Sequence, residues 1–103
     1  MKIKYSSNKL KKILENPRMI KKYYPNEFNN IQIRMTELHA ASRLSLISHK
    51  PPPRRHKLTG IYDGHWAVAV SKNLRIVFRP IDEKLSDPED ITEIIIVDII
   101  DYH

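Results

Sequence analysis

Two runs of alternating apolar residues lie near the middle of the chain, on either side of a polar break at Lys72 and Asn73. Residues 66–70 carry an apolar side chain at every second position on one face, and residues 74–78 repeat this pattern. A period of two is typical of a strand that turns one face towards a core. Asn73 tolerates the left-handed backbone that tight turns need. The pattern therefore predicts a β-hairpin whose second strand carries Arg75 on the face opposite its apolar residues.

The most β-prone run of the chain is residues 91–100, where the apolar side chains from Ile94 onward are interrupted only by Asp98. Such continuity predicts a strand that is central in its sheet or covered on both faces. Near the start of the chain, Ile3 and Tyr5 alternate with lysines, which predicts a short edge strand.

Between the first strand and the hairpin, apolar residues recur at the helical spacings of three and four. One of the polar residues 6–8 can cap a first helix, and Pro17 ends or restarts it because proline cannot donate the interior hydrogen bond. A second short helix follows, and Pro25 fits the first turn of a third, longer one. The apolar positions of these helices are Leu10, Ile13, Leu14, Met19, Ile20, Tyr23, Tyr24, Phe28, Ile31, Met35 and Leu38.

Prolines 51–53 predict an extended, stiff connection to the hairpin, and residues 81–90 predict a polar loop. The order of a strand, helices and then several strands indicates an α+β fold. We expect a small antiparallel β-sheet of four to five strands with the N-terminal helices packed on one face. A chain of 103 residues suffices for one modest core, so residues 1–103 are expected to form a single domain.

Composition excludes several classes of protein. The chain has no cysteine, which rules out disulfides, thiolate metal sites and cysteine nucleophiles. No apolar run reaches the roughly 18 residues of a membrane span, so we expect a cytoplasmic protein with no membrane contact. His39, His49 and His65 form no zinc-binding spacing, and neither a metal nor another cofactor is expected.

The net charge is +6, and its distribution along the chain is uneven. Residues 1–25 carry eight Lys or Arg against one Glu, residues 26–79 carry nine against three acids, and residues 80–103 carry one against eight. A basic body with an acidic C-terminal quarter is expected if a polyanion meets one surface while the acidic part lies elsewhere. An ordinary solvated charged surface is the alternative interpretation of each lysine run.

Cations, imidazoles and a phenol flank the predicted strands at residues 54–57, at Arg75 and Arg79, and at residues 101–103. On a small antiparallel sheet these segments can lie side by side. Because RNA carries its own nucleophile, the 2′-OH, a base, an acid and cations for the phosphate would suffice to cleave it without a metal. Taken singly, each residue also has an ordinary interpretation, such as an exposed strand arginine or a tyrosine that anchors the last strand.

Four segments together resemble the HigB toxins, a branch of the RelE/ParE toxin superfamily. They are R-x-H-K-L-x-G at residues 54–60, H-W-A-V-A-V-S from His65, N-L-R-I-V-F at residues 73–78, and the terminal E-I-I-I-V-D-I-I-D-Y-H. The resemblance implies the toxin of a type II toxin–antitoxin pair, a ribosome-dependent endoribonuclease that cuts mRNA during translation. It also implies a HigA-type helix-turn-helix antitoxin as partner, through which alone the toxin would contact operator DNA.

The family's reactive groups correspond here to His56, Lys57, Arg75, Asp101, Tyr102 and His103. One of the two histidines would take the 2′-OH proton and the other would protonate the leaving 5′ oxygen, and the residues leave open which does which. Lys57 and Arg75 would stabilise charge on the phosphate, and Asp101 would orient an imidazole. Tyr102 would stack on a base or bind the phosphate.

A wider set of cations is expected to hold the RNA backbone, because clustered Lys and Arg bind phosphates with little regard to sequence. This set comprises Arg54, Arg55, Arg79, Lys9, Lys11, Lys12, Lys21 and Lys22. Two alternatives share the expected fold: a ParE-like inhibitor that binds DNA gyrase, and a non-catalytic module that binds RNA or antitoxin. A gyrase inhibitor has no need of a histidine, lysine and arginine set around one phosphate.

Overall fold

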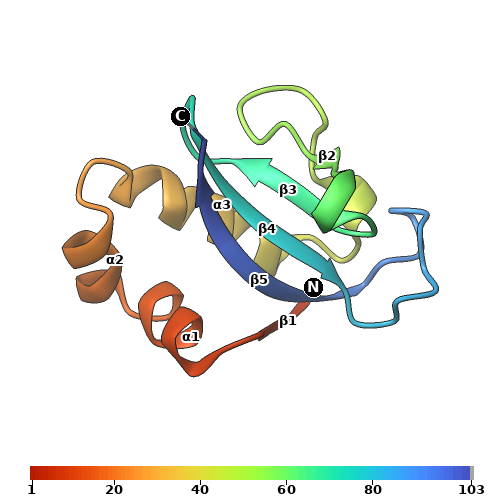
Figure 1. Ribbon diagram of the computed structural model, residues 1–103, viewed down its shortest axis with the longest axis horizontal. Coiled ribbons are helices and arrows are strands. Elements are labelled where there is room, and N and C mark those ends of the chain that lie inside the picture. The colour runs from red at the N-terminus through yellow and green to blue at the C-terminus, as the bar shows by residue number, and fades with distance from the viewer. Residues whose placement is uncertain (103) are drawn as a thin grey trace.

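The computed structural model describes residues 1–102, which fold into a five-stranded sheet with helices on one side (Figure 1). The strands are β1 (Lys2–Tyr5), β2 (His56–Lys57), β3 (Trp66–Ala69), β4 (Leu74–Pro80) and β5 (Glu93–Asp101). The helices are α1 (Asn8–Leu14), α2 (Pro17–Tyr23) and α3 (Phe28–Ala40), with short 3₁₀ turns η1 (Leu44–Leu46) and η2 (Gly60–Tyr62).

The sheet has the order β1-β5-β4-β3-β2, so β5 is an interior strand between β1 and β4, as predicted. The predicted hairpin is also confirmed, because β3 and β4 pair antiparallel with Trp66 opposite Phe78 and Val68 opposite Ile76. The α+β class and the helices on the sheet are confirmed as well. One pair of strands is parallel, β1 with β5, so the sheet is mixed. Most of the chain lies between these two strands, so no tight turn forces them to run in opposite directions.

Each of the first two helices begins at a capping side chain. The Ser7 hydroxyl accepts a hydrogen bond from the Leu10 amide at 3.2 Å, and the Asn16 side chain accepts one from the Arg18 amide at 3.0 Å. Pro17 occupies the first turn of α2, where its missing N–H is not needed. The third helix begins at Phe28, after a turn at residues 25–27 that contains the proline expected inside its first turn.

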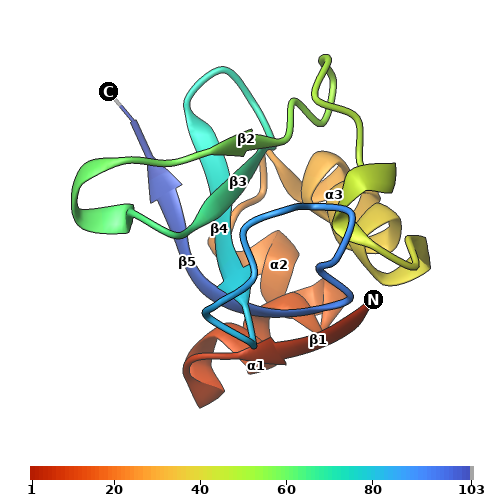
Figure 2. The ribbon, with the colours of Figure 1, turned by 90° about the vertical axis from the view of Figure 1, so that its right-hand side faces the viewer.

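The core lies between the helices and one face of the sheet (Figures 1 and 2). Ile31 and Leu38 of α3 have no exposed surface, and neither have Ile76 and Phe78 of β4. Ile94 and Ile96 of β5 belong to the same core. Burying side chains of this size contributes on the order of 2 kcal/mol each, which makes this layer the main source of stability.

Polar side chains of α3 hold the end of the hairpin. Nε of the buried Arg34 donates to the Ala69 carbonyl at 2.9 Å, and Nδ2 of Asn30 donates to the Val70 carbonyl at 3.0 Å. A second Arg34 nitrogen pairs with the Glu37 carboxylate. Helical periodicity did not predict a buried arginine. Its guanidinium satisfies a carbonyl at the strand end that the core would otherwise leave without a partner.

The connection through Pro51, Pro52 and Pro53 differs from the extended segment that was predicted. The Pro51–Pro52 peptide bond is cis, and the Arg54 amide donates to the Lys50 carbonyl at 3.1 Å, so these residues form a turn. Residues 81–90 form the expected polar loop, which an ion pair of 2.5 Å between Arg43 and Glu89 ties to the segment before η1. Within residues 1–102, none of the helices combines the length and apolarity needed to cross a bilayer.

Candidate active site

The face of the sheet opposite the helices, here called the open face, carries two rows of neighbouring side chains. In one row Ala69 lies opposite Arg75, which lies opposite Ile100. The second row is His56, Ala67, Val77 and Asp98, listed from β2 to β5. Adjacent strands are about 4.8 Å apart, and rows two residues apart on one strand are separated by about 6.8 Å. The two rows therefore place Arg75 and His56 on the same face, with only small side chains between them.

Arg75 is held by the turn of its own hairpin. Its Nη1 donates to the carbonyl of Ser71 at 2.7 Å and to that of Leu74 at 3.1 Å. Burial lowers the pKa of this guanidinium, the positive charge of Arg54 lowers it further, and Tyr102 acts in the opposite direction. Arginine still stays protonated at neutral pH. Arg75 is thus a partly buried, fixed cation with a second cation and a phenol close by.

Two other segments meet Arg75 at this end of the open face. The Tyr102 amide donates to the Asn73 carbonyl at 2.9 Å, which ties the end of β5 to the hairpin turn. Tyr102 is 46% exposed. The Ala69 amide donates to the Pro53 carbonyl at 2.7 Å, which brings Arg54 beside β3. The Arg54 backbone is left-handed, with φ of 46°. Two guanidinium groups and an exposed phenol form a site suited to a phosphate and an adjacent base.

His56 occupies the next row of the open face, and the structure defines its tautomer. Its Nδ1 lies 2.8 Å from the Arg54 carbonyl oxygen. Because a carbonyl can only accept, Nδ1 must carry the hydrogen, and Nε2 of the neutral ring then has a free lone pair for a proton. The imidazole can therefore serve as a base on the side facing away from Arg54.

A β-bulge directs Asp98 onto the open face. Val77 pairs with Asp98 but the next residue, Phe78, pairs with Ile96, so Val97 is an extra residue in β5. Without it, simple alternation would turn Asp98 towards the core. Sequence reasoning missed this residue as a member of the site. The signal was present, since Asp98 is the single charge within the apolar run.

Tyr62 of η2 reaches across the open face to Asp98. Its hydroxyl donates to Oδ2 of Asp98 at 3.1 Å, and its ring contacts that of His65 edge-to-face, with centroids 5.5 Å apart. Burial raises the pKa of Tyr62, and the hydrogen bond to Asp98 raises it further. Figure 2 shows this loop (green) on the side of the sheet away from α3. The loop explains why Ala67 and Val77 have no exposed surface although no helix covers them.

Two of the predicted site residues that precede the hairpin are not brought together with Arg75. Lys57 pairs with the buried Trp66, and its Nζ lies 5.9 Å from that ring's centroid, on the helical side of the sheet. The Arg55 guanidinium also lies over Trp66, at 5.4 Å, and its Nε donates to the Ile47 carbonyl at 2.8 Å. The reason is strand alternation, which turns both residues away from His56. Arg55 therefore anchors the segment before β2.

The end of the chain is divided between the two faces. Asp101 is exposed and pairs with the core residue Leu74, which places it on the helical side. There it contributes to raising the pKa of Tyr24, after burial, Asp98 and Glu27. His103 lies outside the described residues. Across residues 1–102, no cluster of three or more His, Asp or Glu side chains is arranged to hold a metal ion.

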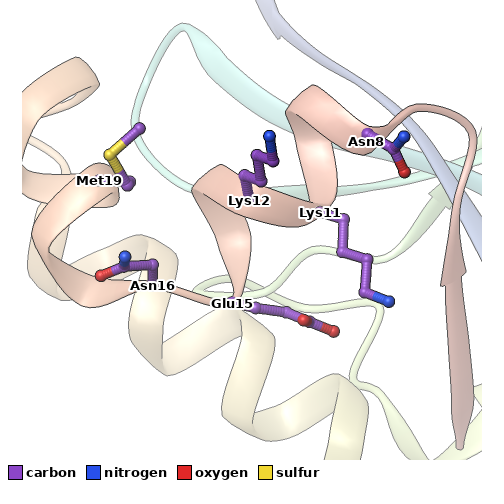
Figure 3. A pocket seen from close by; sticks show the side chains of 6 residues that line it. All are labelled: Asn8, Lys11, Lys12, Glu15, Asn16 and Met19. Carbon is purple, nitrogen blue, oxygen red and sulfur yellow. The ribbon is translucent and has the colours of Figure 1, made fainter.

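The predicted lysines form a surface of their own on the far side of the sheet. All five are exposed, on α1 and α2, whose apolar residues pack on the helical face of the sheet. A pocket of about 510 Å³ lies between these helices, and Figure 3 shows Lys11 and Glu15 extending to the same side of it. The five residues are Lys9, Lys11, Lys12, Lys21 and Lys22. The structure therefore separates this basic surface from Arg75 by the thickness of the sheet.

No protein-family model matches the chain, and no curated protein does. Several solved structures match its fold. YafQ from E. coli aligns with a TM-score of 0.61 at 16% identity, over 96% of this chain and 90% of that one. A YoeB/ParE toxin from Agrobacterium tumefaciens aligns over the whole of both chains, with a TM-score of 0.57 at 11% identity. The YoeB–YefM complex from Staphylococcus aureus aligns over 100% of this chain and 97% of that chain, with a TM-score of 0.56 at 14% identity. The chain therefore has the RelE-like toxin fold.

Proposed function

We propose that this chain is the toxin of a type II toxin–antitoxin pair and that the open face of its sheet binds and cleaves RNA. The observation that carries the proposal is Arg75, fixed by its hairpin turn beside Arg54 and the exposed phenol of Tyr102. Arg75 is a partly buried cation beside a second cation, and the two repel each other. An anionic ligand such as a phosphodiester relieves that repulsion.

In the proposed reaction, Nε2 of His56 takes the proton of the 2′-OH, whose oxygen attacks the adjacent phosphorus. Arg75 and Arg54 stabilise the negative charge that builds on the phosphate oxygens, a contribution of roughly 3 kcal/mol per well-placed donor. The 5′ oxygen leaves with a proton from the C-terminal segment, where His103 is the proposed acid. The products are a 2′,3′-cyclic phosphate and a 5′-hydroxyl, and no metal takes part.

Some residues that the sequence analysis assigned to the catalytic site have other roles in this proposal. Lys57 holds Trp66 and meets RNA from the sheet edge, while Asp101 helps to position the end of β5. Tyr102 stacks on a base next to the cleaved bond. The toxin is proposed to be of the HigB type, to act in the cytoplasm on ribosome-bound mRNA, and to pair with a HigA-type antitoxin. The fold it shares with the toxin of a solved toxin–antitoxin complex supports a partner of this kind.

The test is induction of the chain in cells, followed by mapping of new mRNA 5′ ends. Wild type is compared with Arg75→Ala and with a matched control, Lys72→Ala, which removes an exposed cation from the same hairpin turn. Cuts within translated frames are expected for wild type and the control, and about a hundredfold fewer for Arg75→Ala. Growth arrest with intact mRNA would instead indicate a gyrase inhibitor, and no arrest would indicate a binding module.

A further inference from the structure

A second pocket lies on the open face, between the loop that carries Tyr62 and the end of β4 that carries Arg79. It has a volume of about 350 Å³, and its walls come from the loop before β3 and from the end of β4. The lining residues are Asp63, Gly64, His65, Arg79, Pro80 and Glu83. Arg79 lies on the same strand and face as Arg75, four residues further on, or about 13 Å. The loop that carries Tyr62 covers Val77 between the two arginines, so an RNA strand bound at Arg75 reaches this pocket by passing over that loop.

The charges in this pocket differ from those around Arg75. The pocket pairs one guanidinium with two carboxylates, from Asp63 and Glu83, so its lining is not cationic. An anionic phosphate is disfavoured there, whereas a neutral ring with both hydrogen-bond donors and acceptors suits the lining. The volume is ample for such a ring.

The donor and acceptor groups of the pocket lie next to one another. Nη1 of Arg79 lies 3.5 Å from Oε1 of Glu83 and donates to the Pro80 carbonyl at 3.1 Å, which leaves further guanidinium N–H groups to donate. Beside them, Nδ1 of His65 lies 3.1 Å from the Asp63 carbonyl, so this ring too carries its hydrogen on Nδ1 and can accept at Nε2. The edge-to-face contact with Tyr62 fixes the His65 ring, and Asp98 fixes Tyr62.

We propose that this pocket binds a guanine base of the RNA strand that the Arg75 site cleaves. Guanine presents two adjacent donors, N2 and N1, followed by two adjacent acceptors, O6 and N7. A carboxylate beside a guanidinium is the matching arrangement, with Glu83 accepting from the first pair and Arg79 donating to the second. Adenine alternates acceptor, donor and acceptor along the same edge, so it cannot make a bidentate contact with both side chains. That the guanine belongs to an RNA strand rests on the proposed function.

The first test measures binding without cleavage. The full chain is titrated with GMP, AMP, CMP and UMP, each of which carries one phosphate. The NMR signals of the His65 ring and the Gly64 amide are followed. GMP is expected to give saturable shifts at these positions and to bind about tenfold more tightly than the other three, because only guanine can make bidentate contacts with both Glu83 and Arg79. Equal affinities, or no saturable shift at His65, would overturn the guanine pocket.

The second test changes the carboxylate. Glu83→Gln keeps the side-chain shape but loses one of the two acceptor oxygens, so the preference for GMP is expected to fall to about twofold. Glu89→Gln is the matched control, since it neutralises a carboxylate of the same loop outside the pocket. In cells, wild-type and control cut sites should share a guanine at a constant distance from the cut, and Glu83→Gln should lose that preference.

The two proposals can fail separately. If mRNA is cleaved but GMP binds no better than AMP, the guanine pocket is wrong and the nuclease stands. If GMP binds selectively and no mRNA is cut, the pocket stands and the nuclease is wrong.

Discussion

The hydroxyl of Tyr62 donates a hydrogen bond to the carboxylate of Asp98, 3.1 Å away and 36 residues further along the chain. The bond holds the loop between β2 and β3 across the open face, where the Tyr62 ring also contacts the His65 ring. It exists only because the bulge at Val97 turns Asp98 to that face. The loop that this bond holds therefore lies between the Arg75 site and the proposed guanine pocket.

Replacing Tyr62 with phenylalanine should release this loop. The substitution keeps the ring and removes the hydrogen bond to a charged acceptor, so the free energy of unfolding should fall by about 1 kcal/mol, since the site is partly exposed. The amides of Asp63 and His65 should exchange hydrogen faster. Urea unfolding and hydrogen exchange measure both effects, and combining the change with Asp98→Asn should add little further loss. A fully additive double variant would show that the two side chains do not act together.

Replacing Arg34 with alanine should be among the most destabilising single changes outside the apolar core. It leaves the Ala69 carbonyl without its donor and the Glu37 carboxylate without its partner. The expected loss is about 3 kcal/mol in the free energy of unfolding, measured by urea denaturation. Arg18→Ala, which removes an exposed arginine from α2, is the control and should change stability by less than about 0.5 kcal/mol.

The alkaline limit of stability should depend on Tyr5. Burial, and next the negative charge of Glu15, raise the pKa of this phenol from 10.0 to about 12. The folded state therefore holds the proton more tightly than the unfolded state. Stability should be unaffected below about pH 10 and fall between about pH 10 and 12, measured as the urea midpoint at each pH.

Tyr5→Phe isolates this effect. Among the buried side-chain nitrogen and oxygen atoms of residues 1–102, the Tyr5 hydroxyl is the one with no hydrogen-bond partner. Its removal should therefore leave stability at pH 7 unchanged or slightly higher. The alkaline loss should be smaller than in wild type, whereas Tyr23→Phe, at an exposed ring, should follow wild type. Parallel curves for wild type and Tyr5→Phe would contradict the assignment.

The lysines of α1 should control salt-dependent attachment to ribosomal RNA if the proposed function holds. Replacing Lys11 and Lys12 with glutamine should weaken ribosome binding and reduce the slope of log affinity against log salt by about 2, roughly one per phosphate contact. Sedimentation with ribosomes over a range of salt concentrations measures this slope. A variant with Lys2→Gln and Lys84→Gln has the same net charge and should keep the wild-type slope, and an unchanged slope in the α1 variant would contradict this role.

Local patterns in the sequence were sufficient for the elements themselves. The two-residue period of 66–70 and 74–78 predicted the hairpin, and the apolar run after Ile91 predicted an interior strand. Such predictions succeed because the period of a strand or helix is imposed by its own backbone and by the need to bury one face. The placement of Arg75 opposite the core followed from the same alternation.

Strand pairing decided what the local pattern could not. The bulge moved Asp98 to the open face, and the register of β2 with β3 placed His56 on the open face and Lys57 on the helical side. Burial of Arg34 depended on a carbonyl at the end of β3. Each outcome depends on a partner that is distant in sequence, and a shift of one residue in pairing reverses the face of every side chain that follows. The sequence by itself therefore determined which residues form strands and helices, and tertiary pairing determined which polar side chains share a site.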